Sequence, residues 1–322
     1  MNSRHSDLLL TFLLVGGCAR EPAETSAARK PVNIAFVTNN ASDFWRIAEA
    51  GVRKAEIDFS VKCDFRMAPS GTAADQQAII EALIARGIDG MAISPNDSEN
   101  QIDLLNKAAA AMPLICHDSD APKSNRRCFV GTDNYKAGRA AGTLIREVLP
   151  EGGKIMLFVG RIDAQNAIER ANGIRDEVKG TSIEVLDIRT DLTDRAKAKS
   201  NVEDVIASTP DIGCLVGLWS YNGPAILSAV KDARKSGQIP IVCFDEEPDT
   251  LQGIEEGAIR ATVVQDPYEF GYQSVQILAA LARDEDPKIP EDRIVDVPVQ
   301  IIRKDNLEAF RKRLAERLGK KG

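Results

Sequence analysis

Polar side chains stand where the apolar runs of this sequence end. The run Leu114–Cys116 stops abruptly at His117 and Asp118, which is the pattern of a buried parallel strand whose carboxyl end is polar. In open α/β sheets, ligands bind outside the carboxyl ends of the strands. A second run, 128–131, leads into Asn134, which is placed to cap the following helix. We therefore expect a carboxylate and an amide to face one crevice.

Other predicted strand ends carry the same kinds of side chain. The candidate ligand-binding residues at or near these ends are Thr38, Ser42, Phe44, Trp45, Ser94, Asp118, Asn134, Trp219, Asp245 and Gln265. Carboxylates accept hydrogen bonds from vicinal hydroxyl groups, amides both donate and accept, and aromatic faces cover the apolar side of a sugar ring. Because the sequence has two histidines and no evident nucleophile, this chemistry indicates a polyol-binding site rather than a reaction.

Several of these residues have a simpler structural interpretation. Asp118 and Asp245 could be surface carboxylates, and one of Phe44 and Trp45 is expected in the core. Trp219 could pack beneath a helix, and Asn134 could serve only as a helix cap. A histidine such as His117, without a nucleophile or metal partner, is usually structural. Glu246 and Glu247 are expected to be solvated.

The elements that would position these residues alternate regularly. Strands are predicted near 32–38, 61–67, 88–94, 114–117 and 128–131, and again near 154–159, 183–188, 213–218, 241–244 and 261–265. Amphipathic helical segments lie between them. Such alternation predicts parallel sheets with helices on both faces, and two sets of about five strands predict two sheets. The fold class is therefore α/β, with two doubly wound parallel-sheet lobes.

The chain resembles the type I periplasmic binding proteins of ABC sugar importers, specifically the ribose-binding group. The resemblance covers about residues 31–303 and is carried by the segments IAFVTNNASDFW, GIDGMAISPNDSE, MPLICHDSDA, FVGTDNYKAGRAAG, NAIERANGI, GLWSYNGPAIL, IVCFDEEPD and ATVVQDPYEFGY. It implies that the ten candidate residues contact a ligand and that three strand crossovers form a hinge near 132–133, 265–266 and 297–298. It also implies an N-terminal lobe of 31–132 with 266–297 and a C-terminal lobe of 133–265 with 298–322.

The sequence departs from the ribose-binding pattern at four positions. Ser119 and Ile168 stand where ribose binders have arginines, and Ser94 and Trp219 stand where they have asparagines. The loss of two guanidinium groups and the gain of an indole predict a sugar other than ribose. Arg161, Asp163 and Gln165 are candidates for replacement contacts.

The composition excludes several other functions. A formal net charge of -7 disfavours a nucleic-acid partner, which would require a concentrated positive field. The basic residues of 311–321 are interleaved with leucines and are expected on the solvated face of a terminal helix. The sequence has no Walker A loop, no G-x-S-x-G and no metal-ligand cluster, so we expect neither an enzyme nor a bound cofactor or metal.

The first thirty residues are expected to lie outside the fold. An apolar run at 8–15 has the size of a signal-peptide core, and Val15–Cys18 resembles the lipobox of bacterial lipoproteins. By that resemblance Cys18 is lipidated, residues 19–30 form a tether, and the protein is periplasmic or held at the cell envelope. An ordinary secretory signal is the alternative. The other cysteines are Cys63, Cys116, Cys128, Cys214 and Cys243, an odd number of which at least one cannot pair within the chain.

Together these features predict a lipid-anchored monomer that closes two lobes around a monosaccharide and delivers it to the membrane permease of an ABC importer. A repressor of the lactose-repressor type would need an N-terminal DNA-binding domain of about 50–60 residues, for which the signal and tether leave no room. A sensor that presents its ligand to a chemoreceptor or histidine kinase is the alternative. The sequence does not separate import from sensing, nor does it identify the sugar.

Overall fold

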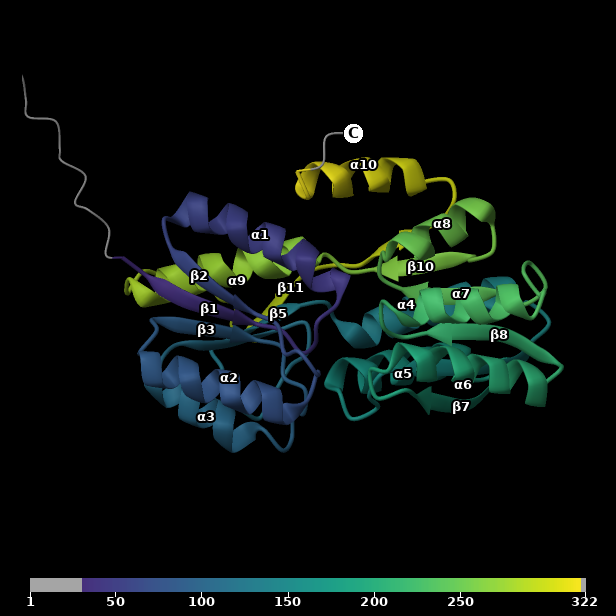
Figure 1. The fold of residues 1–322 in the computed structure, drawn as a ribbon, viewed down its shortest axis with the longest axis horizontal. Helices are drawn as coiled ribbons and strands as arrows, with labels where there is room; N and C mark the ends of the chain where they lie inside the picture. Colours follow the sequence, from purple (N-terminus) through teal and green to yellow (C-terminus); the bar gives the residue numbers. More distant parts are fainter. Residues whose placement is uncertain (1–30, 320–322) are drawn as a thin grey trace, which may run out of the picture. The chain divides into compact units, whose positions relative to one another are not determined.

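Two six-stranded sheets organise the chain in the computed structural model, which describes residues 31–319 (Figure 1). The first sheet has the order β11-β5-β4-β3-β1-β2. Its strands are β1 (Asn33–Val37), β2 (Lys62–Arg66), β3 (Gly90–Ile93), β4 (Leu114–His117), β5 (Phe129–Gly131) and β11 (Ile294–Asp296). All of its pairings are parallel.

The second sheet repeats this plan with the order β12-β10-β9-β8-β6-β7. Its strands are β6 (Gly153–Val159), β7 (Ile183–Thr190), β8 (Ile212–Gly217), β9 (Ile241–Phe244), β10 (Ala261–Val264) and β12 (Gln300–Ile302). Only β12 is antiparallel to its neighbour. The prediction of two parallel sheets is confirmed, but β11 and β12 were not predicted. Each is only three residues long, and β11 is largely exposed, so neither carries the apolar run that marks a buried strand.

Helices cover both faces of each sheet. They are α1 (Asp43–Phe59), α2 (Ala73–Arg86), α3 (Ile102–Ala111), α4 (Asn134–Val148), α5 (Gln165–Val178), α6 (Arg195–Ser208), α7 (Asn222–Asp232), α8 (Pro248–Glu256), α9 (Pro267–Ala282) and α10 (Leu307–Arg317). In the first lobe, α1 and α9 share one core with the sheet, and α2 and α3 share another on the opposite face. In the second lobe, α4 and α5 cover one face, and α6, α7, α8 and α10 contribute to the core on the other.

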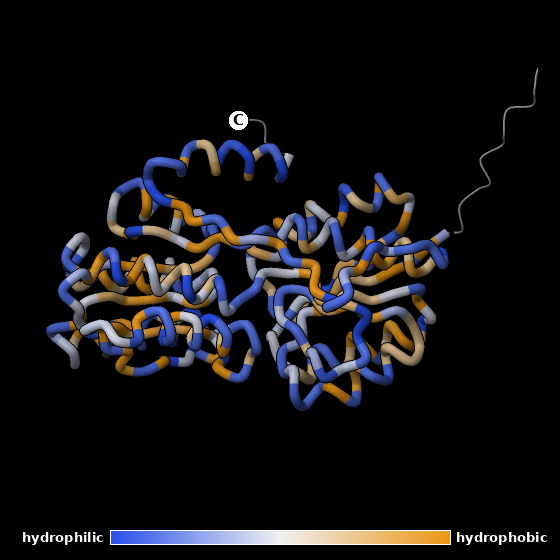
Figure 2. Tube along the Cα trace, turned by 180° about the vertical axis from the view of Figure 1, so that it is seen from behind, coloured by the Kyte–Doolittle hydropathy of each residue, from blue (hydrophilic) through white to orange (hydrophobic). Residues whose placement is uncertain are grey.

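The strand sequences explain the double layer. In β1, Ile34 and Phe36 enter the α1 and α9 core, whereas Ala35 and Val37 enter the α2 and α3 core. Side chains alternate between faces along a strand, so a strand buried on both faces must be apolar at every position. Figure 2 shows these hydrophobic stretches along the strands, while the helices alternate between hydrophobic and hydrophilic residues.

The chain passes between the sheets three times. It leaves β5 of the first sheet for α4, leaves β10 of the second sheet for α9, and finally runs from β11 to β12. Thr132 Oγ1 donates a hydrogen bond of 2.9 Å to the Val297 carbonyl, which joins the first and third crossovers. The three predicted crossovers between the sheets are confirmed.

One helix begins one residue earlier than predicted. The side chain of Asp133, not that of Asn134, caps α4 by accepting a hydrogen bond from the Lys136 backbone N–H at 2.9 Å. The prediction of Asn134 as a cap is wrong, because an aspartate directly before it fills that position and Asn134 becomes the first helical residue. Its side chain is thereby free for contacts inside the molecule.

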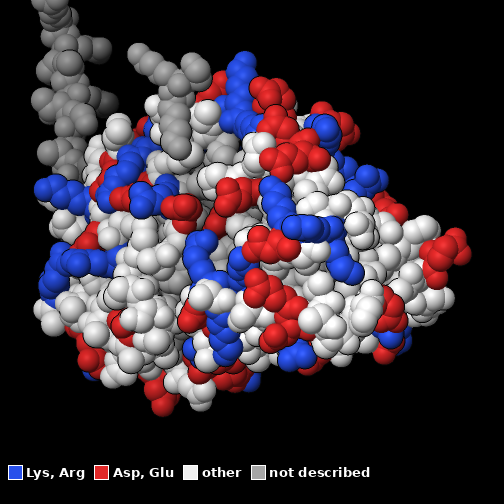
Figure 3. All heavy atoms as spheres, turned by 45° about the vertical axis from the view of Figure 1, so that its right-hand side comes forward, with Lys and Arg blue, Asp and Glu red and all other residues white. Residues whose placement is uncertain are grey.

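The cysteines, the search for membrane-spanning helices and the surface charge complete the description of the fold. Cys63, Cys116, Cys128, Cys214 and Cys243 are free and buried, and burial raises the pKa of the last three thiols to about 12. Cys18 and the segment that resembles a lipobox lie outside the described residues. Among residues 31–319, no helix combines the length and apolarity needed to cross a bilayer. On the face drawn in Figure 3, acidic and basic side chains are interspersed.

Candidate functional site

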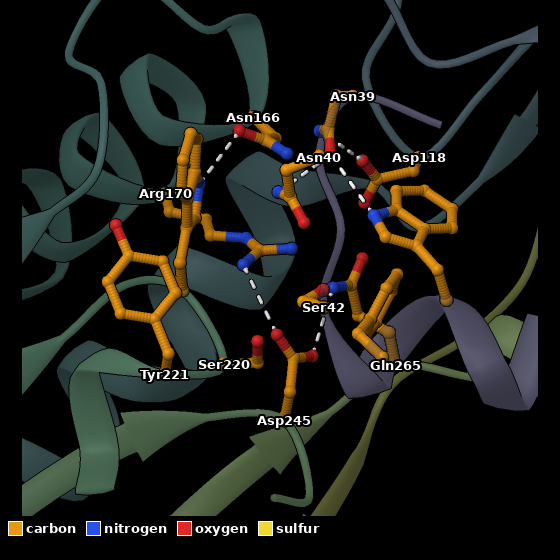
Figure 4. A pocket seen from close by; sticks show the side chains of 13 residues that line it. Asn39, Asn40, Ser42, Asp118, Asn166, Arg170, Ser220, Tyr221, Asp245 and Gln265 are labelled. Atoms are coloured by element: carbon orange, nitrogen blue, oxygen red, sulfur yellow. Dashed lines mark hydrogen bonds and ion pairs between the residues drawn. The ribbon is translucent and has the colours of Figure 1, made fainter. Parts of the chain in front are cut away.

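A small polar pocket lies where the carboxyl ends of strands from both sheets meet (Figure 4). It is lined by Asn39, Asn40, Ser42, Phe44, Trp45, Asp118, Asn166, Arg170, Trp219, Ser220, Tyr221, Asp245 and Gln265. Seven of the ten candidate residues from the sequence are in this set. The enclosed space is about 30 Å³, which suits two or three water molecules and is well below the volume of ordinary ligand pockets, about 300–1,000 Å³.

Asp118 reaches the pocket from the end of β4. Its backbone N–H donates to Val130 O at 3.2 Å, and its φ of 59° lies in the left-handed region that aspartate tolerates better than most residues. Its carboxylate accepts hydrogen bonds from Ser94 Oγ at 2.8 Å and Asn39 Nδ2 at 3.3 Å. Burial raises the pKa of Asp118 to about 6, although the Arg170 guanidinium and the Ser94 hydrogen bond oppose that shift.

Asp245 occupies the equivalent position in the second sheet, at the end of β9. Its backbone N–H donates to Val263 O at 2.9 Å and its φ is 67°, so both aspartates leave their strands with the same backbone turn. Gln265 Nε2 donates to its carboxylate at 3.0 Å. Burial raises the pKa of Asp245 as well, again opposed by Arg170. The two carboxylates thus approach one pocket from separate sheets, as the sequence predicted.

Arg170 lies between the two carboxylates and was not predicted. It belongs to α5 and is 1% exposed, and its Nη1 is 4.0 Å from an Asp245 carboxylate oxygen. Its Nε donates to Asn134 Oδ1 at 2.9 Å, its Nη1 donates to Leu218 O at 2.6 Å, and its guanidinium lies 4.4 Å from the centre of the Phe244 ring. Burial lowers the pKa of Arg170, and the neighbouring carboxylates oppose that shift only in part.

Arg170 places a guanidinium in the pocket, although Ile168 stands where the resemblance to ribose binders implies an arginine. Ile168 is 39% exposed and does not line the pocket, whereas Arg170, two residues further along α5, does. Residues two apart on a helix point in different directions, so a shift of two exchanges a buried side chain for an exposed one. The pocket therefore contains the guanidinium of Arg170, and the absence of arginine at Ser119 and Ile168 remains a prediction against ribose.

Aromatic rings form two walls of the pocket. Phe44 and Trp45 of α1 are both buried and pack edge to face with centroids 4.9 Å apart, and Trp45 Nε1 donates to Asn39 Oδ1 at 3.2 Å. On the other side, Trp219 Nε1 donates to Asn166 Oδ1 at 3.1 Å. Both indoles thus keep their N–H groups satisfied while their rings line the pocket.

Three candidate residues stand behind the lining rather than in it. Thr38 Oγ1 donates to Asn40 O at 2.7 Å, and Ser94 Oγ donates to Asp118. Asn134 Nδ2 donates to Asp118 O at 3.2 Å while its Oδ1 accepts from Arg170. Each of these side chains holds a residue that lines the pocket.

Three buried polar atoms of the lining have no hydrogen-bond partner among the described residues. They are Asn40 Oδ1, Arg170 Nη2 and Gln265 Oε1. Buried polar groups in proteins are nearly always paired, and an unpaired one costs about 1–3 kcal/mol. Two acceptors and one donor therefore surround a space that suits a molecule able both to donate and to accept hydrogen bonds, as hydroxyl groups do.

Two further expectations concern Glu246 with Glu247 and Arg161 with Asp163. Glu246 and Glu247 are 6% and 8% exposed rather than solvated, and Arg195 and Ser220 donate hydrogen bonds to Glu247. Arg161 and Asp163 pair with each other at 2.6 Å outside the lining.

The candidate replacement contact Gln165 also lies outside the lining and hydrogen-bonds to Glu169. His117 is fully buried, and its Nε2 lies 3.1 Å from Val37 O. Its ring stacks on Phe36, and burial lowers its pKa to about 3, so this histidine is neutral at physiological pH.

The residues that sequence reasoning missed divide into two kinds. Five of them lie in the same polar segments after strands as the predicted residues, so the strand-end pattern indicates the segment but not the individual residue. They are Asn39, Asn40, Asn166, Ser220 and Tyr221. Arg170 had no such signal, because it is on the second turn of α5 and depends on how that helix packs against α4.

Comparison with known proteins agrees with this architecture. The model of a periplasmic binding protein domain matches residues 34–286, so the chain belongs to that family. Among its relatives, a ribose import binding protein of Bacillus subtilis (strain 168) is 25% identical over 272 residues, which cover 82% of this chain and 88% of that protein. A D-allose-binding periplasmic protein of Escherichia coli (strain K12) is 24% identical and covers 80% and 87%.

Solved structures extend the similarity to the whole fold. An ABC transporter solute-binding protein from Burkholderia graminis, in complex with D-arabinose, is 27% identical with a TM-score of 0.82, covering 88% of this chain and 98% of that chain. A solute-binding protein from Agrobacterium vitis with bound D-fucose is 25% identical with a TM-score of 0.82, covering 88% and 99%. These relatives are binding proteins rather than enzymes.

Proposed function

We propose that this protein is the sugar-binding component of an ABC importer and that it encloses a monosaccharide between its two lobes. One observation carries the proposal: Asp118 and Asp245 reach one pocket from equivalent strand ends of the two sheets, with the Arg170 guanidinium between them (Figure 4). Ionised carboxylates and a guanidinium form the stronger class of hydrogen bonds with hydroxyl groups.

The remaining lining completes a sugar site. The unpaired atoms of Asn40, Arg170 and Gln265 would each gain a partner from a hydroxyl-bearing ligand. Phe44, Trp45 and Trp219 would cover the apolar faces of the ring. Thr38, Ser94 and Asn134 complete the proposed set by holding the lining residues in place, although they do not line the pocket themselves.

Binding requires the lobes to move apart and close again. The space in the described state is about 30 Å³, which is too small for a monosaccharide. Contacts from both lobes are complete only when the cleft is shut, so the ligand favours the closed state by its differential affinity for that state. We place the moving bodies at 31–132 with 266–297 and 133–265 with 298–322, because the three crossovers fall between these ranges.

The importer role rests on the relatives. Proteins named for ribose import and for allose binding match more than three quarters of this chain, which favours delivery to a membrane permease over the sensor alternative. Family membership supports an extracytoplasmic location. Anchoring through Cys18 and a monomeric state are part of the same proposal.

Isothermal titration calorimetry with a panel of pentoses and hexoses tests the proposal. Asp118→Asn and Asp245→Asn each replace a charged acceptor by a neutral amide, and each is expected to weaken binding by about 100-fold, since hydrogen bonds to charged groups contribute about 1.5–3 kcal/mol each. Asp249→Asn is the matched control, because Asp249 is an exposed carboxylate on neighbouring α8. Unchanged affinity in both site variants, or no heat with any sugar, would overturn the proposal.

A further inference from the structure

A second and much larger cavity adjoins the proposed sugar pocket. It has a volume of about 620 Å³, within the range of about 300–1,000 Å³ that small-molecule sites occupy. Phe44, Ser220 and Asp245 line both spaces, so the two share one wall. A ligand held at Asp245 could therefore extend from the first space into the second.

The walls of this second cavity combine an apolar face with eight polar or charged residues, which are Asp43, Arg46, Ser220, Asp245, Glu246, Glu247, Gln252 and Arg311. Ile47 comes from α1, Leu251 from α8, and Leu314 from α10, with Leu318 directly after that helix. These side chains come from three helices of different parts of the chain, so the cavity depends on how those helices meet. An apolar group placed against the face formed by Ile47, Leu251 and Leu314 would leave water, whereas a hydroxyl group there would lack a partner.

One polar group in the wall lacks a partner. Glu246 is 6% exposed, and its Oε2 has no hydrogen-bond partner among the described residues. Burial and the neighbouring Asp245 raise its pKa well above the ordinary value, which favours a neutral carboxylic acid. The adjacent Glu247 differs, because both of its oxygens accept hydrogen bonds from Arg195. The cavity thus places an apolar face beside a buried carboxyl group that has an unpaired oxygen.

Helix α10 is held in place over the cavity from both ends. Leu307 and Phe310 pack into the core of the second lobe, and Arg311 pairs with Glu255 of α8 at 2.9 Å. At the other end, Arg317 pairs with Asp266 of the second crossover at 2.7 Å. These contacts hold Leu314 of α10 against the cavity.

We propose that the ligand is a glycoside, whose sugar ring occupies the pocket between Asp118 and Asp245 and whose apolar aglycone occupies the cavity bounded by α1, α8 and α10. This inference rests on the proposed function, since the sugar ring must bind as described there. Glu246 offers a hydrogen bond to a polar atom of the aglycone.

Matched pairs of ligands test the inference in calorimetry. The monosaccharide that binds best in the panel is compared with its own phenyl glycosides, α and β, and with a disaccharide carrying the same sugar at its non-reducing end. One phenyl anomer is expected to bind about tenfold tighter than the free sugar, because an aromatic ring leaves water for an apolar wall. The disaccharide is expected to gain nothing.

Filling the cavity should remove this gain selectively. Leu314→Trp narrows the cavity from α10 without changing the sugar pocket, so the phenyl glycoside should lose its tenfold advantage while the free sugar binds as before. Lys312→Trp, on the exposed side of the same helix, is the control and should change neither affinity. Leu314→Ala, which enlarges the cavity, serves as a second variant if the tryptophan destabilises the fold. It should leave the free sugar unaffected and lower the phenyl glycoside's advantage.

The outcomes separate the two proposals. If free sugars bind but neither phenyl anomer binds tighter, or if Leu314→Trp and Leu314→Ala weaken free sugar and glycoside equally, the glycoside inference is wrong and the sugar-binding function stands. If only the disaccharide binds tighter than the free sugar, the assignment of the cavity to an apolar aglycone is wrong. If no sugar and no glycoside binds, both proposals fail.

Discussion

Removal of the Arg170 guanidinium is the most informative single perturbation of this protein. Arg170→Met retains much of the side-chain volume but removes the positive charge that faces Asp118 and Asp245. It also removes the donors to Asn134 Oδ1 and Leu218 O. Because all of these groups are buried, solvent cannot replace what is lost.

The structure sets the magnitude of the effect. The difference between a pKa of about 6 for Asp118 and its ordinary 3.8 corresponds to about 3 kcal/mol for keeping that carboxylate ionised. This cost exists with Arg170 present and rises without it. Breaking a buried ion pair from one side typically costs about 3–5 kcal/mol, so we expect Arg170→Met to lower the free energy of unfolding by about that amount at pH 7.5.

The pH dependence distinguishes charge from packing. The folded-state pKa of Asp118 is raised, so the folded protein binds a proton between about pH 4 and 6 where the unfolded chain does not. Its destabilising contribution is therefore fully present above about pH 6 and is lost progressively as the pH falls from about 6 to about 4. In Arg170→Met the pKa values of both aspartates rise further. Protonation of these carboxylates therefore reduces the destabilisation of the variant at a higher pH than in the wild type. The loss of stability should shrink by about half between pH 7.5 and pH 5.

Urea unfolding followed by tryptophan fluorescence at pH 7.5 and pH 5 measures this difference. Arg170→Lys retains a charge and should lose less stability at pH 7.5 than Arg170→Met does. Arg161→Met is the control, because Arg161 pairs with Asp163 at the surface, where such pairs contribute at most about 1 kcal/mol. An equal loss for Arg170→Met at both pH values would refute the electrostatic reasoning and leave packing as the cause.

Three further predictions concern other parts of the molecule. Gly160→Ala would place a Cβ 2.3 Å from Trp219 Cζ3 and 2.5 Å from Tyr221 Oη, so it should displace the indole and weaken sugar binding in calorimetry. Gly213→Ala is the control and should retain the affinity for sugar, because the atom nearest to its Cβ is the flexible end of Leu149 at 3.1 Å. Equal affinities of the two variants would contradict the wall assigned to Trp219. Solution scattering should show a larger radius of gyration for the protein without sugar than with it, since the closed pocket of about 30 Å³ admits no sugar, and identical curves across the panel would argue against hinge motion. Growth with labelled palmitate should tag the wild type but not Cys18→Ser, and a tag on both would exclude Cys18 as the anchor.

The sequence alone was sufficient for the fold and for much of the site. A parallel strand buried on both faces must be apolar throughout, as β1 is, and its first polar residue marks the edge where ligands bind. This rule located Asp118 and Asp245 without any coordinates. The same rule could not detect β11 and β12, whose three residues pair at the sheet edges without an apolar run.

Tertiary packing decided what local patterns could not. Arg170 enters the pocket because α5 packs closely against α4, where a Cβ on Gly138 would lie 2.2 Å from Arg170 O. Glu246 and Glu247 are buried because α1, α8 and α10, distant in the sequence, meet around them. The end of a buried strand is a local feature that the sequence itself shows. Whether a helical side chain points into a pocket, and whether a charge is buried, depends on which distant elements pack against it.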